Sequence, residues 1–336
     1  MFQKEFEKLS RVIDKKVRNS KTISVCFDSD ADGCSSAAIL VIYLLKEFKK
    51  YPNNLISCFH DVDEKLRDLK DDLIFVLDTQ PKKKDSSNLI IIDHHIVHSI
   101  PKKSFFFNPM IFDKNSYIAT SYLVCKILNN LTDMSDACWI AALGVKADKS
   151  EDFCKDIIKL TEEKYPEFRN VEKRLIRLTS VARNLSDASL VVNSLVECYN
   201  IGSPSFFGKT ESSSRLLRIS KYIDREVIDV LSKAEKIIET EKIIVYGIDS
   251  EFNIQGVIAN NLFIRHPKKI IVVCNFMKHK EIIHVEVRDN QEWAFKRFNE
   301  ELKDMVEDLG GHKQAFGLSI LRARIPDFLE RLSKFK

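Results

Sequence analysis

Three short apolar runs in the N-terminal part of the chain lead directly into an aspartate. They are TISVCF (22–27) before Asp28, LIFVLD (73–78) ending in Asp78, and LIIID (89–93) ending in Asp93. The last two runs are too continuously apolar for a sheet with one wet face, so they predict strands buried on both faces, as in a parallel α/β sheet. Because ligand sites favour the carboxyl edge of such a sheet, we expect the three carboxylates to share one site.

The first of these aspartates opens an acidic turn, DSDADG (28–33), which precedes a predicted helix at 35–49. Carboxylates at spacing two favour a hard divalent cation, which needs clustered oxygen ligands, and Gly33 allows a sharp turn into the helix. A solvated acidic turn is the plain alternative. An EF-hand loop is excluded, since its twelfth position would be Ile39 instead of Glu and a strand precedes it.

Two histidines, His94 and His95, follow Asp93 at once. A single Asp after a strand is often only a turn residue, but three strands that each end in a carboxylate favour a metal site. Carboxylate together with imidazole suits Mn²⁺, and less distinctively Mg²⁺, Zn²⁺ or Fe²⁺. Asp148 ends a helical run, AALGVKAD, and would by itself be interpreted as a surface residue.

Hydrophobic periodicity predicts three regions: an α/β domain at 1–150, a helical connector at 151–241, and a smaller α/β domain at 242–336. A fourth N-terminal strand is expected at 55–60. Further helices are expected at 118–131, 134–147, 214–241, 256–265, 292–309 and 326–335, and further strands at 242–248, 269–276, 282–287 and 318–325.

Composition excludes several classes of protein. No apolar run approaches the roughly 18 residues of a membrane span, and the charged N-terminus lacks the apolar core of a signal peptide. The eight cysteines lie singly with no C-x-x-C pair, which predicts a reduced, cytoplasmic chain with Cys as small core residues. The net charge of +4 permits a phosphate-bearing partner without proving one.

Taken in order, these motifs resemble the DHH phosphoesterase superfamily and its DHHA1 branch. The matching segments are DSDADG (28–33), LDTQP (77–81), IIDHH (91–95), GVKAD (144–148) and GGHKQAFG (310–317). The D-x-D-x-D-G form is more similar to RecJ-type and archaeal RecJ-like nucleases than to the oligoribonucleases and cyclic-dinucleotide hydrolases. The resemblance implies a parallel-sheet catalytic domain and a smaller DHHA1 domain, with the active-site cleft between them.

The resemblance also implies roles for individual residues. The family holds two divalent metals, usually Mn²⁺, with Mg²⁺ possible. By analogy Asp28 and Asp30 would face one metal, Asp32, His94 and Asp148 the other, and Asp78 would bridge both. Asp93 would orient the site, and His95 would reach the scissile phosphate.

The smaller domain would supply substrate contacts. Gly310 and Gly311, expected between a helix and a strand, would bring backbone N–H groups to a phosphate, and His312 would stabilise the transition-state charge. Arg288 would bind a substrate phosphate, with Arg183 and Asn184 as weaker candidates. The alternatives are an ordinary glycine helix cap and a plain surface charge.

The sequence thus favours a metal-dependent phosphodiesterase that trims single-stranded DNA or RNA from an end. One alternative is a hydrolase of short oligonucleotides, cyclic dinucleotides or phosphorylated nucleotides. Another is a replication-complex scaffold, although the survival of all the metal-ligand positions favours activity. A replication or repair protein is a further expected partner. The lysines at 82–84 and 102–103 could line a path for a phosphate backbone, whereas Phe105–Phe107 is expected in the core.

Overall fold

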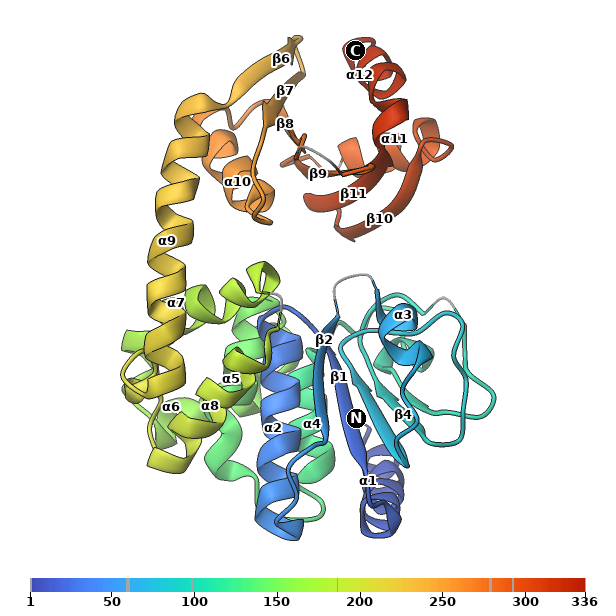
Figure 1. The fold of residues 1–336 in the computed structure, drawn as a ribbon, viewed down its shortest axis with the longest axis vertical. Helices are drawn as coiled ribbons and strands as arrows, with labels where there is room; N and C mark the ends of the chain where they lie inside the picture. The colour runs from blue at the N-terminus through green and yellow to red at the C-terminus, as the bar shows by residue number, and fades with distance from the viewer. Residues whose placement is uncertain are drawn as a thin grey trace. The chain divides into compact units, whose positions relative to one another are not determined.

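The computed structural model describes residues 2–58, 61–97, 99–185, 187–277, 280–291 and 293–335, with the backbone alone at 308, 311 and 312. The chain divides into two compact units, Met1–Ser220 and Lys221–Lys336, and the dividing point lies within a long helix, α9 (Figure 1). Each unit is built around its own β-sheet.

Unit 1 contains a five-stranded parallel sheet with the order β2-β1-β3-β4-β5. Its strands are β1 (Ile23–Asp28), β2 (Asn54–Cys58), β3 (Leu73–Leu77), β4 (Leu89–Ile92) and β5 (Phe105–Phe107). Every residue of β3 and β4 is buried, as expected for strands covered on both faces. The structure therefore confirms the parallel α/β interpretation of the apolar runs.

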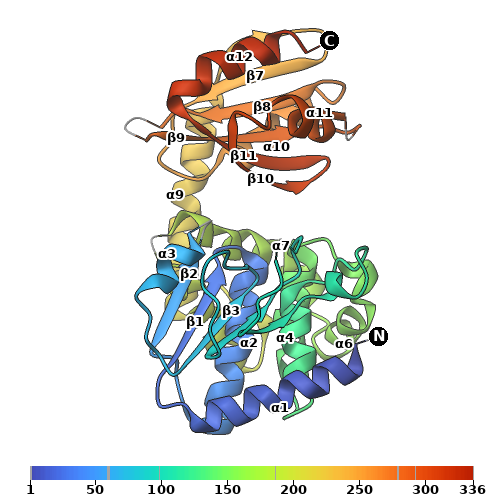
Figure 2. The same ribbon diagram turned by 90° about the vertical axis from the view of Figure 1, so that its right-hand side faces the viewer.

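Helices cover both faces of this sheet. The helices of unit 1 before α9 are α1 (Gln3–Asn19), α2 (Ala31–Phe48), α3 (Val62–Arg67), α4 (Thr120–Leu128), α5 (Cys138–Ala147), α6 (Lys155–Lys164), α7 (Phe168–Thr179) and α8 (Ser189–Ile201). On one face Val62 and Leu66 of α3 pack on alternate residues of β1, β3 and β4. On the other face α2 lies against β1 (Figure 2). Helix α2 is itself enclosed by α4, α5 and α8. Residues 31–44 of α2 are all buried, so the first turn of this helix lies inside the unit.

The edge strand β5 corrects one expectation about the triple phenylalanine. Phe105–Phe107 pairs in parallel with β4 instead of serving only as core. Phe107 is buried in an aromatic cluster with Phe2 and Phe6 of α1, while Phe105 is exposed. Phe105 and Phe107 point to the same face of the strand, so Phe107 is buried because it packs against Phe2 and Phe6.

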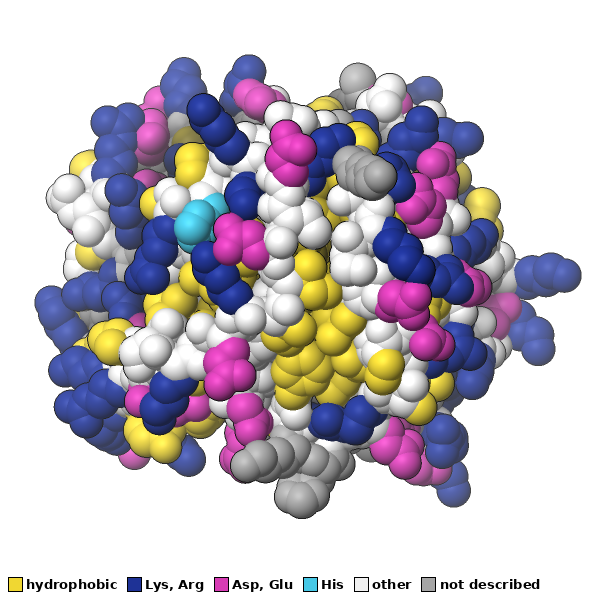
Figure 3. Space-filling model, turned by 90° about the horizontal axis from the view of Figure 1, so that it is seen from above, with side chains coloured by type: hydrophobic (Ala, Val, Ile, Leu, Met, Phe, Trp, Pro, Cys, Tyr) yellow, Lys and Arg dark blue, Asp and Glu magenta, His cyan; other side chains and the backbone are white. Residues whose placement is uncertain are grey.

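Unit 2 contains a six-stranded mixed sheet with the order β10-β11-β9-β8-β7-β6, in which only β7 and β8 run parallel. Its elements, after α9 (Glu211–Lys233), are β6 (Glu235–Glu239), β7 (Ile243–Ile248), α10 (Gln255–Arg265), β8 (Ile270–Asn275), β9 (Ile282–Arg288), α11 (Trp293–Glu301), β10 (Val306–His312), β11 (Ala315–Leu321) and α12 (Ile325–Ser333). Helices α11 and α12 pack through Phe298 and Phe328 on one face, and α10 covers the other. Apolar side chains also gather on the face of this unit that Figure 3 views.

Two predicted helices extend too far. Residues 235–239 form the edge strand β6 instead of the end of a helix at 214–241, because they pair with β7 and Ile238 packs on the core. Residues 306–312 form β10 instead of the end of a helix at 292–309. Only Val306 and Leu309 of β10 have apolar side chains, so its sequence pattern does not predict a strand. Pairing with β11 determines its extended conformation.

The eight cysteines are all free and buried, as the sequence predicts. Among the helices of the described residues, none has the length and apolar character needed to cross a membrane.

Candidate metal centre

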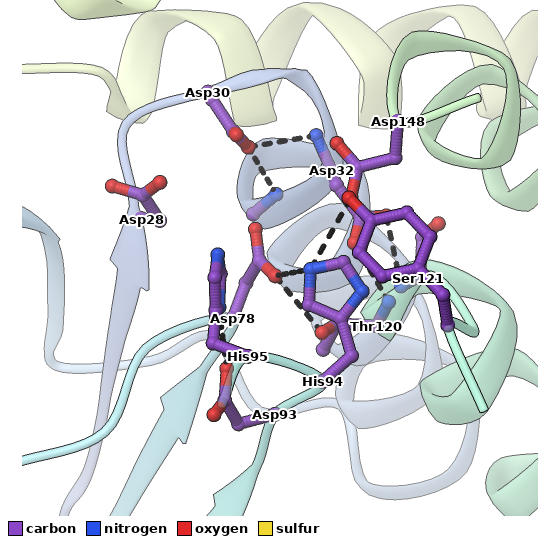
Figure 4. A network of polar contacts seen from close by, with 12 residues as sticks. Asp28, Asp30, Asp32, Asp78, Asp93, His94, His95, Thr120, Ser121 and Asp148 are labelled. Carbon is purple, nitrogen blue, oxygen red and sulfur yellow. Dashed lines mark hydrogen bonds and ion pairs between the residues drawn. The ribbon is translucent and has the colours of Figure 1, made fainter. Parts of the chain in front are cut away.

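The carboxyl edge of the unit 1 sheet brings the three expected carboxylates together (Figure 4). Strands β1, β3 and β4 are neighbours in the sheet, so the chain leaves adjacent strands at Asp28, Asp78 and Asp93. Asp78 has a backbone φ of 62°, a left-handed conformation that is uncommon outside glycine. Such backbone strain is frequent at functional sites, and it directs the Asp78 side chain into the cluster drawn in Figure 4.

The acidic turn contributes Asp30 and Asp32 through the start of α2. Asp30 is the N-cap: its Oδ1 accepts hydrogen bonds from the N–H groups of Asp32 and Gly33, both at 2.9 Å. Its Oδ2 lies 3.1 Å from a guanidinium nitrogen of Arg183. One carboxylate oxygen of Asp30 thus caps α2, and the other contacts Arg183 of the 3₁₀ helix Ser180–Asn184.

Asp32 lies fully buried against the N-terminus of α4. Its two carboxylate oxygens accept hydrogen bonds from the N–H groups of Thr120 (2.7 Å) and Ser121 (3.0 Å). Free N–H groups at a helix N-terminus favour a negative charge, so α4 stabilises Asp32 as a carboxylate. The Thr120 hydroxyl donates to Oδ1 of Asp78 (2.9 Å).

His94 lies at the centre of the cluster and is only 1% exposed. Its Nε2 lies 3.3 Å from Oδ1 of Asp78 and 3.2 Å from Oδ2 of Asp148, the residue that ends α5. The imidazole stacks on Tyr117, with ring centroids 4.9 Å apart, and the Tyr117 hydroxyl donates to Oδ2 of Asp148 (3.3 Å). Asp148 is thus a member of the buried cluster and not the surface residue that its local sequence indicates.

Three sets of side chains place one potential ligand atom each within 4.8 Å of one another: Asp28, Asp30 and Asp78; Asp32, His94 and Asp148; and Asp78, His94 and His95. The first two sets are the groups expected around two separate cations. Asp78 also belongs to the third set, so it is close to donors of both groups. These are the oxygen and imidazole ligands that Mn²⁺ or Mg²⁺ takes.

An unpartnered atom supports this fit. Asp78 Oδ2 is buried and has no hydrogen-bond partner among the described residues. An unsatisfied buried carboxylate oxygen is costly, and a bound cation would remove that cost. The residues present therefore fit a divalent-metal site.

The electrostatics of the cluster point the same way. Burial and the charge of Asp30 raise the pKa of Asp28 to about 7 and that of Asp32 to about 6. Burial, followed by repulsion from Asp32, also raises the pKa values of Asp78 and Asp148 well above their ordinary range. The cluster therefore holds more negative charge than its own surroundings neutralise.

Two groups depart from this trend. Burial would raise the pKa of Asp30 as well, but the Arg183 charge and the Gly33 N–H outweigh burial and lower it. Burial, together with the charge of His95, lowers the pKa of His94 to about 4. His94 is therefore neutral near pH 7, the protonation state in which an imidazole binds a metal.

Asp93 and His95 form a separate pair beside the cluster. His95 Nδ1 lies 2.8 Å from Oδ1 of the buried Asp93, and Asn108 donates to Oδ2 of Asp93 (3.2 Å) and to the backbone carbonyl of His95 (2.9 Å). Burial opposes the charged form of His95, but the hydrogen bond and charge of Asp93 prevail and raise its pKa to about 10. Half of the His95 side chain is exposed, so an imidazolium is presented to solvent beside the metal-ligand sets.

Close backbone approach explains two glycines of the motifs. A Cβ on Gly144 would lie 2.2 Å from the Ser121 hydroxyl oxygen and 2.3 Å from Oδ1 of Asp32. A Cβ on Gly33 would lie 2.2 Å from the backbone carbonyl oxygen of Asp28. All three distances are too short for real atoms, so glycine is required where α5 and α2 approach the cluster.

Four contributors were missed by the sequence analysis: Asn108, Tyr117, Thr120 and Ser121. Thr120 and Ser121 contact Asp32 across 88 and 89 positions of sequence, and no local pattern signals such a contact. An Asn before a Pro usually marks only a turn, and a Ser or Thr at the start of a helix usually serves only as a cap. These residue types therefore did not indicate a site.

The two lysine loops are each organised around a carboxylate. The N–H groups of Lys82 and Lys83 donate to Asp63, and those of Lys102 and Lys103 donate to Asp85. The aspartates offset part of the positive charge that a phosphate path would use.

The expected substrate residues of unit 2 have clear positions only in part. Arg288 donates to Oδ1 of Asn260 (2.6 Å) and to Oε2 of Glu286 (2.8 Å), so its guanidinium is already engaged within its own unit. Gly310 and Gly311 lie inside β10, opposite Gly317 and Phe316, and not between a helix and a strand as expected. The backbone of His312 ends β10, and its side chain lies outside the described residues. Asn184 ends a short 3₁₀ helix, Ser180–Asn184.

Comparison with known families decides the assignment. Residues 22–148, which carry four of the five motifs, match the DHH family, N-terminal domain. These residues therefore form a domain similar to the N-terminal domain of the DHH family, and they include every member of the three ligand sets.

Solved structures give the fold of the remaining chain. RecJ from Thermus thermophilus, in complex with Mn²⁺, is similar over 99% of this chain with a TM-score of 0.71 and 17% identity. This chain spans only 55% of that protein's length. An exonuclease RecJ bound to manganese matches over 98% of this chain and 95% of its own, with a TM-score of 0.65 and 16% identity.

CDC45 from Entamoeba histolytica has a related fold, with 99% of this chain and 98% of that chain covered, a TM-score of 0.56 and 10% identity. A comparison with curated proteins gave no match. At these identities the solved structures establish a RecJ-like fold and leave the activity open.

Proposed function

We propose that the chain is a divalent-metal-dependent phosphodiesterase that removes nucleotides from an end of single-stranded DNA or RNA. The observation that carries this proposal is the pair of ligand sets, Asp28–Asp30–Asp78 and Asp32–His94–Asp148, with Asp78 close to both. Two cations held by neighbouring ligand sets suit in-line displacement at phosphorus.

The ligand sets divide the work of metal binding. Asp28 and Asp30 would hold one cation, Asp32, His94 and Asp148 the other, and Asp78 would contact both. When bound, two divalent cations activate a water molecule and stabilise the attacking and leaving oxygens of the displacement. Thr120 and Ser121 fix both oxygens of Asp32, and Tyr117 fixes the His94 ring, so these residues hold the ligands in place.

The Asp93–His95 pair would act on the substrate. Asp93 keeps His95 protonated at neutral pH, and Asn108 holds both residues, so an imidazolium is available to contact the scissile phosphate. Arg183, beside Asp30, is a second cation at the same edge. Arg288, Gly310, Gly311 and His312 of unit 2 are proposed to bind another substrate phosphate.

Mn²⁺ is the proposed metal, with Mg²⁺ as the alternative. The mixed carboxylate–imidazole ligand set supports Mn²⁺, and so does its presence in the RecJ structures of similar fold.

The proposal is tested with DNA and RNA strands of several lengths, labelled at the 5′ or 3′ end and incubated with Mn²⁺. We expect Mn²⁺-dependent product ladders, at least about 10²-fold slower with Asp78→Asn or His94→Ala, since each removes a metal ligand. Asp152→Asn, an exposed acidic position outside the cluster, is the matched control and retains full activity. Cleavage of only the shortest strands would favour the short-oligonucleotide hydrolase. Absence of cleavage at every length would contradict nuclease activity.

A further inference from the structure

Helix α1 carries a row of exposed cations on its outward face. The opposite face of the helix, which includes Phe6 and Ile13, is buried in unit 1. The cations are three or four residues apart and therefore form one line along the helix, the basic row: Lys4, Lys8, Arg11 and Lys15. Figure 2 shows α1 along the outer border of unit 1, and the whole basic row lies within this unit. None of its residues belongs to the ligand sets of the metal centre.

Neighbouring carboxylates do not neutralise the basic row. Within the described part of the chain, none of its four side chains forms an ion pair or a hydrogen bond. Glu7 lies four residues before Arg11, but its carboxylate accepts a hydrogen bond from Gln3 instead (3.1 Å). In the same helix Asp14 and Arg18 do form an ion pair, at 2.9 Å. The basic row therefore differs from the rest of the surface of α1.

The spacing of the cations costs stability. Like charges three or four residues apart on a helix repel one another, and each cation of the basic row has such a neighbour. No carboxylate of the described residues offsets this repulsion by an ion pair with the row. The row therefore indicates an anionic partner that the structure does not contain.

Exposed aromatic side chains lie at both ends of α1. Phe112 is 55% exposed and packs on Phe2, which directly precedes the helix, with ring centroids 5.6 Å apart. Near the other end Phe105 is 37% exposed, and Nζ of Lys16 lies 4.9 Å from its ring centroid. A partner that covered this surface would contact apolar groups as well as cations.

The spacing of the basic row favours an acidic helix over other anionic partners. At 1.5 Å per residue the cations are about 6.0, 4.5 and 6.0 Å apart along the axis, close to the pitch of about 5.4 Å of an α-helix. A partner helix with carboxylates at the same sequence spacing would place one opposite each cation. A stacked strand offers a phosphate about every 3.4 Å, which does not match this spacing. A helix that lies on a membrane inserts its apolar face into lipid, whereas that face of α1 is buried in unit 1.

We propose that the outward face of α1 binds an acidic amphipathic helix of a partner protein. Its carboxylates would pair with the basic row, and its apolar side chains would pack on the exposed rings of Phe105 and Phe112. Exposed ion pairs are individually weak, so the row would serve mainly to fix the orientation and register of the partner. The inference goes beyond the proposed function and does not depend on it, because the row lies outside the metal centre.

The probe is a labelled helical peptide of about eighteen residues, with glutamates spaced four, three and four residues apart and leucines beside them. A second peptide has the same composition but irregularly spaced glutamates. Binding to the full chain is measured by fluorescence anisotropy. Lys8→Ala/Arg11→Ala should weaken binding of the probe about fivefold, as expected for the loss of two exposed ion pairs, and Ala preserves the helix. Replacing the leucines of the probe by alanine should also weaken binding.

A charge exchange tests the pairing itself. Lys8→Glu/Arg11→Glu should bind the probe at least about tenfold more weakly than the wild type, since repulsion replaces attraction. A peptide with lysines in place of its two middle glutamates should restore binding to this variant. A variant that had lost its fold would show no such rescue.

Lys155→Ala/Lys159→Ala, which removes two exposed cations four residues apart from α6, is the matched control and should bind the probe with wild-type affinity. Wild-type affinity in Lys8→Ala/Arg11→Ala would overturn the inference, and so would equal binding of the irregularly spaced peptide. It would also be overturned if an oligothymidylate of equal charge bound more tightly than the probe and lost affinity in the same variant, since the row would then serve a nucleic acid.

Discussion

Nε2 of His94 lies 3.3 Å from Oδ1 of Asp78, and both side chains are 1% exposed. Asp78 thereby joins the imidazole-containing ligand set to the carboxylates of Asp28 and Asp30. The low pKa of His94 leaves its imidazole neutral near pH 7, so it does not balance the charge of the buried carboxylates around it. Without a bound cation, this burial of carboxylates is unfavourable.

Replacing Asp78 tests that cost. Asp78→Asn removes a buried acidic group, and Asn tolerates the left-handed backbone at this position. We expect the metal-free variant to unfold at a higher urea concentration than the wild type, because burial and the neighbouring Asp32 disfavour the charged Asp78 carboxylate. Excess Mn²⁺, at about 100 times its Kd, should stabilise the wild type by about 2.7 kcal/mol and the variant far less. Urea unfolding measures both effects, and equal Mn²⁺ stabilisation of the two proteins would contradict the assignment of Asp78.

The pH dependence of the metal-free protein follows from the raised carboxyl pKa values. A carboxyl whose pKa is higher in the folded state binds more protons there, so stability falls as pH rises towards the folded pKa. Asp28, with a pKa of about 7, and Asp78 and Asp148, whose pKa values burial raises well above the ordinary range, all act in this direction. His95, with a pKa of about 10, also binds more protons in the folded state and acts in the same direction. The lowered pKa of His94 makes stability rise with pH, but only below about pH 6.5, the ordinary pKa of histidine. We therefore expect the thermal midpoint of unit 1 to fall between about pH 6.5 and about pH 8.

Mn²⁺ provides the control for this pH series. A bound cation neutralises the carboxylates, so the part of the fall in the thermal midpoint that they cause should disappear in its presence, and the part that His95 causes should remain. A metal-free midpoint that rises over the same interval would show that the cluster is not the source of the charge repulsion.

Close packing around Gly144 predicts a strong effect of a single methyl group. Gly144→Ala would place a Cβ into the Ser121 hydroxyl and the Asp32 carboxylate. We expect a loss of about 1–3 kcal/mol of unfolding free energy, typical of overpacking, together with weaker Mn²⁺ binding because Asp32 must move. Urea unfolding and calorimetric Mn²⁺ titration measure the two effects. An unchanged unfolding midpoint would mean that α5 does not approach Asp32 as closely as the structure shows.

The charge of His95 should depend on Asp93. In Asp93→Asn the hydrogen bond loses its negative partner, so the pKa of His95 should fall from about 10 towards its ordinary value of about 6.5. Proton NMR titration of the histidine ring gives this value directly, with Asp152→Asn as the control. A His95 pKa that stays near 10 in the variant would assign the raised value to other charges.

Much of the candidate metal centre could be predicted from sequence because its proposed ligands Asp28, Asp78 and His94 lie at or just after the ends of buried strands. Continuous apolar runs such as 73–77 identify parallel strands, and the residue after each strand then lies at a known edge. Asp148 was predicted only through the family resemblance, since it ends a helix and its local pattern is that of a surface residue. Its partner His94 is far away in the sequence, and only the fold shows that contact.

The strands of the second unit were harder to predict because two of them lack a continuous apolar run. Strands β6 and β10 lie at the two edges of a mixed sheet and have few apolar residues, so pairing with β7 and β11 determines their conformation. The contacts of Thr120 and Ser121 with Asp32 were missed because they depend on how α4 packs beside α2.

The central claim is that unit 1 holds two cations with Asp78 in contact with both. Anomalous scattering from crystals grown with Mn²⁺ tests it most directly. We predict two anomalous peaks about 3.5–4 Å apart. One should lie beside Asp28 and Asp30, the other beside Asp32, His94 and Asp148, with the Asp78 carboxylate between them. A single peak, or two peaks away from Asp78, would contradict the account.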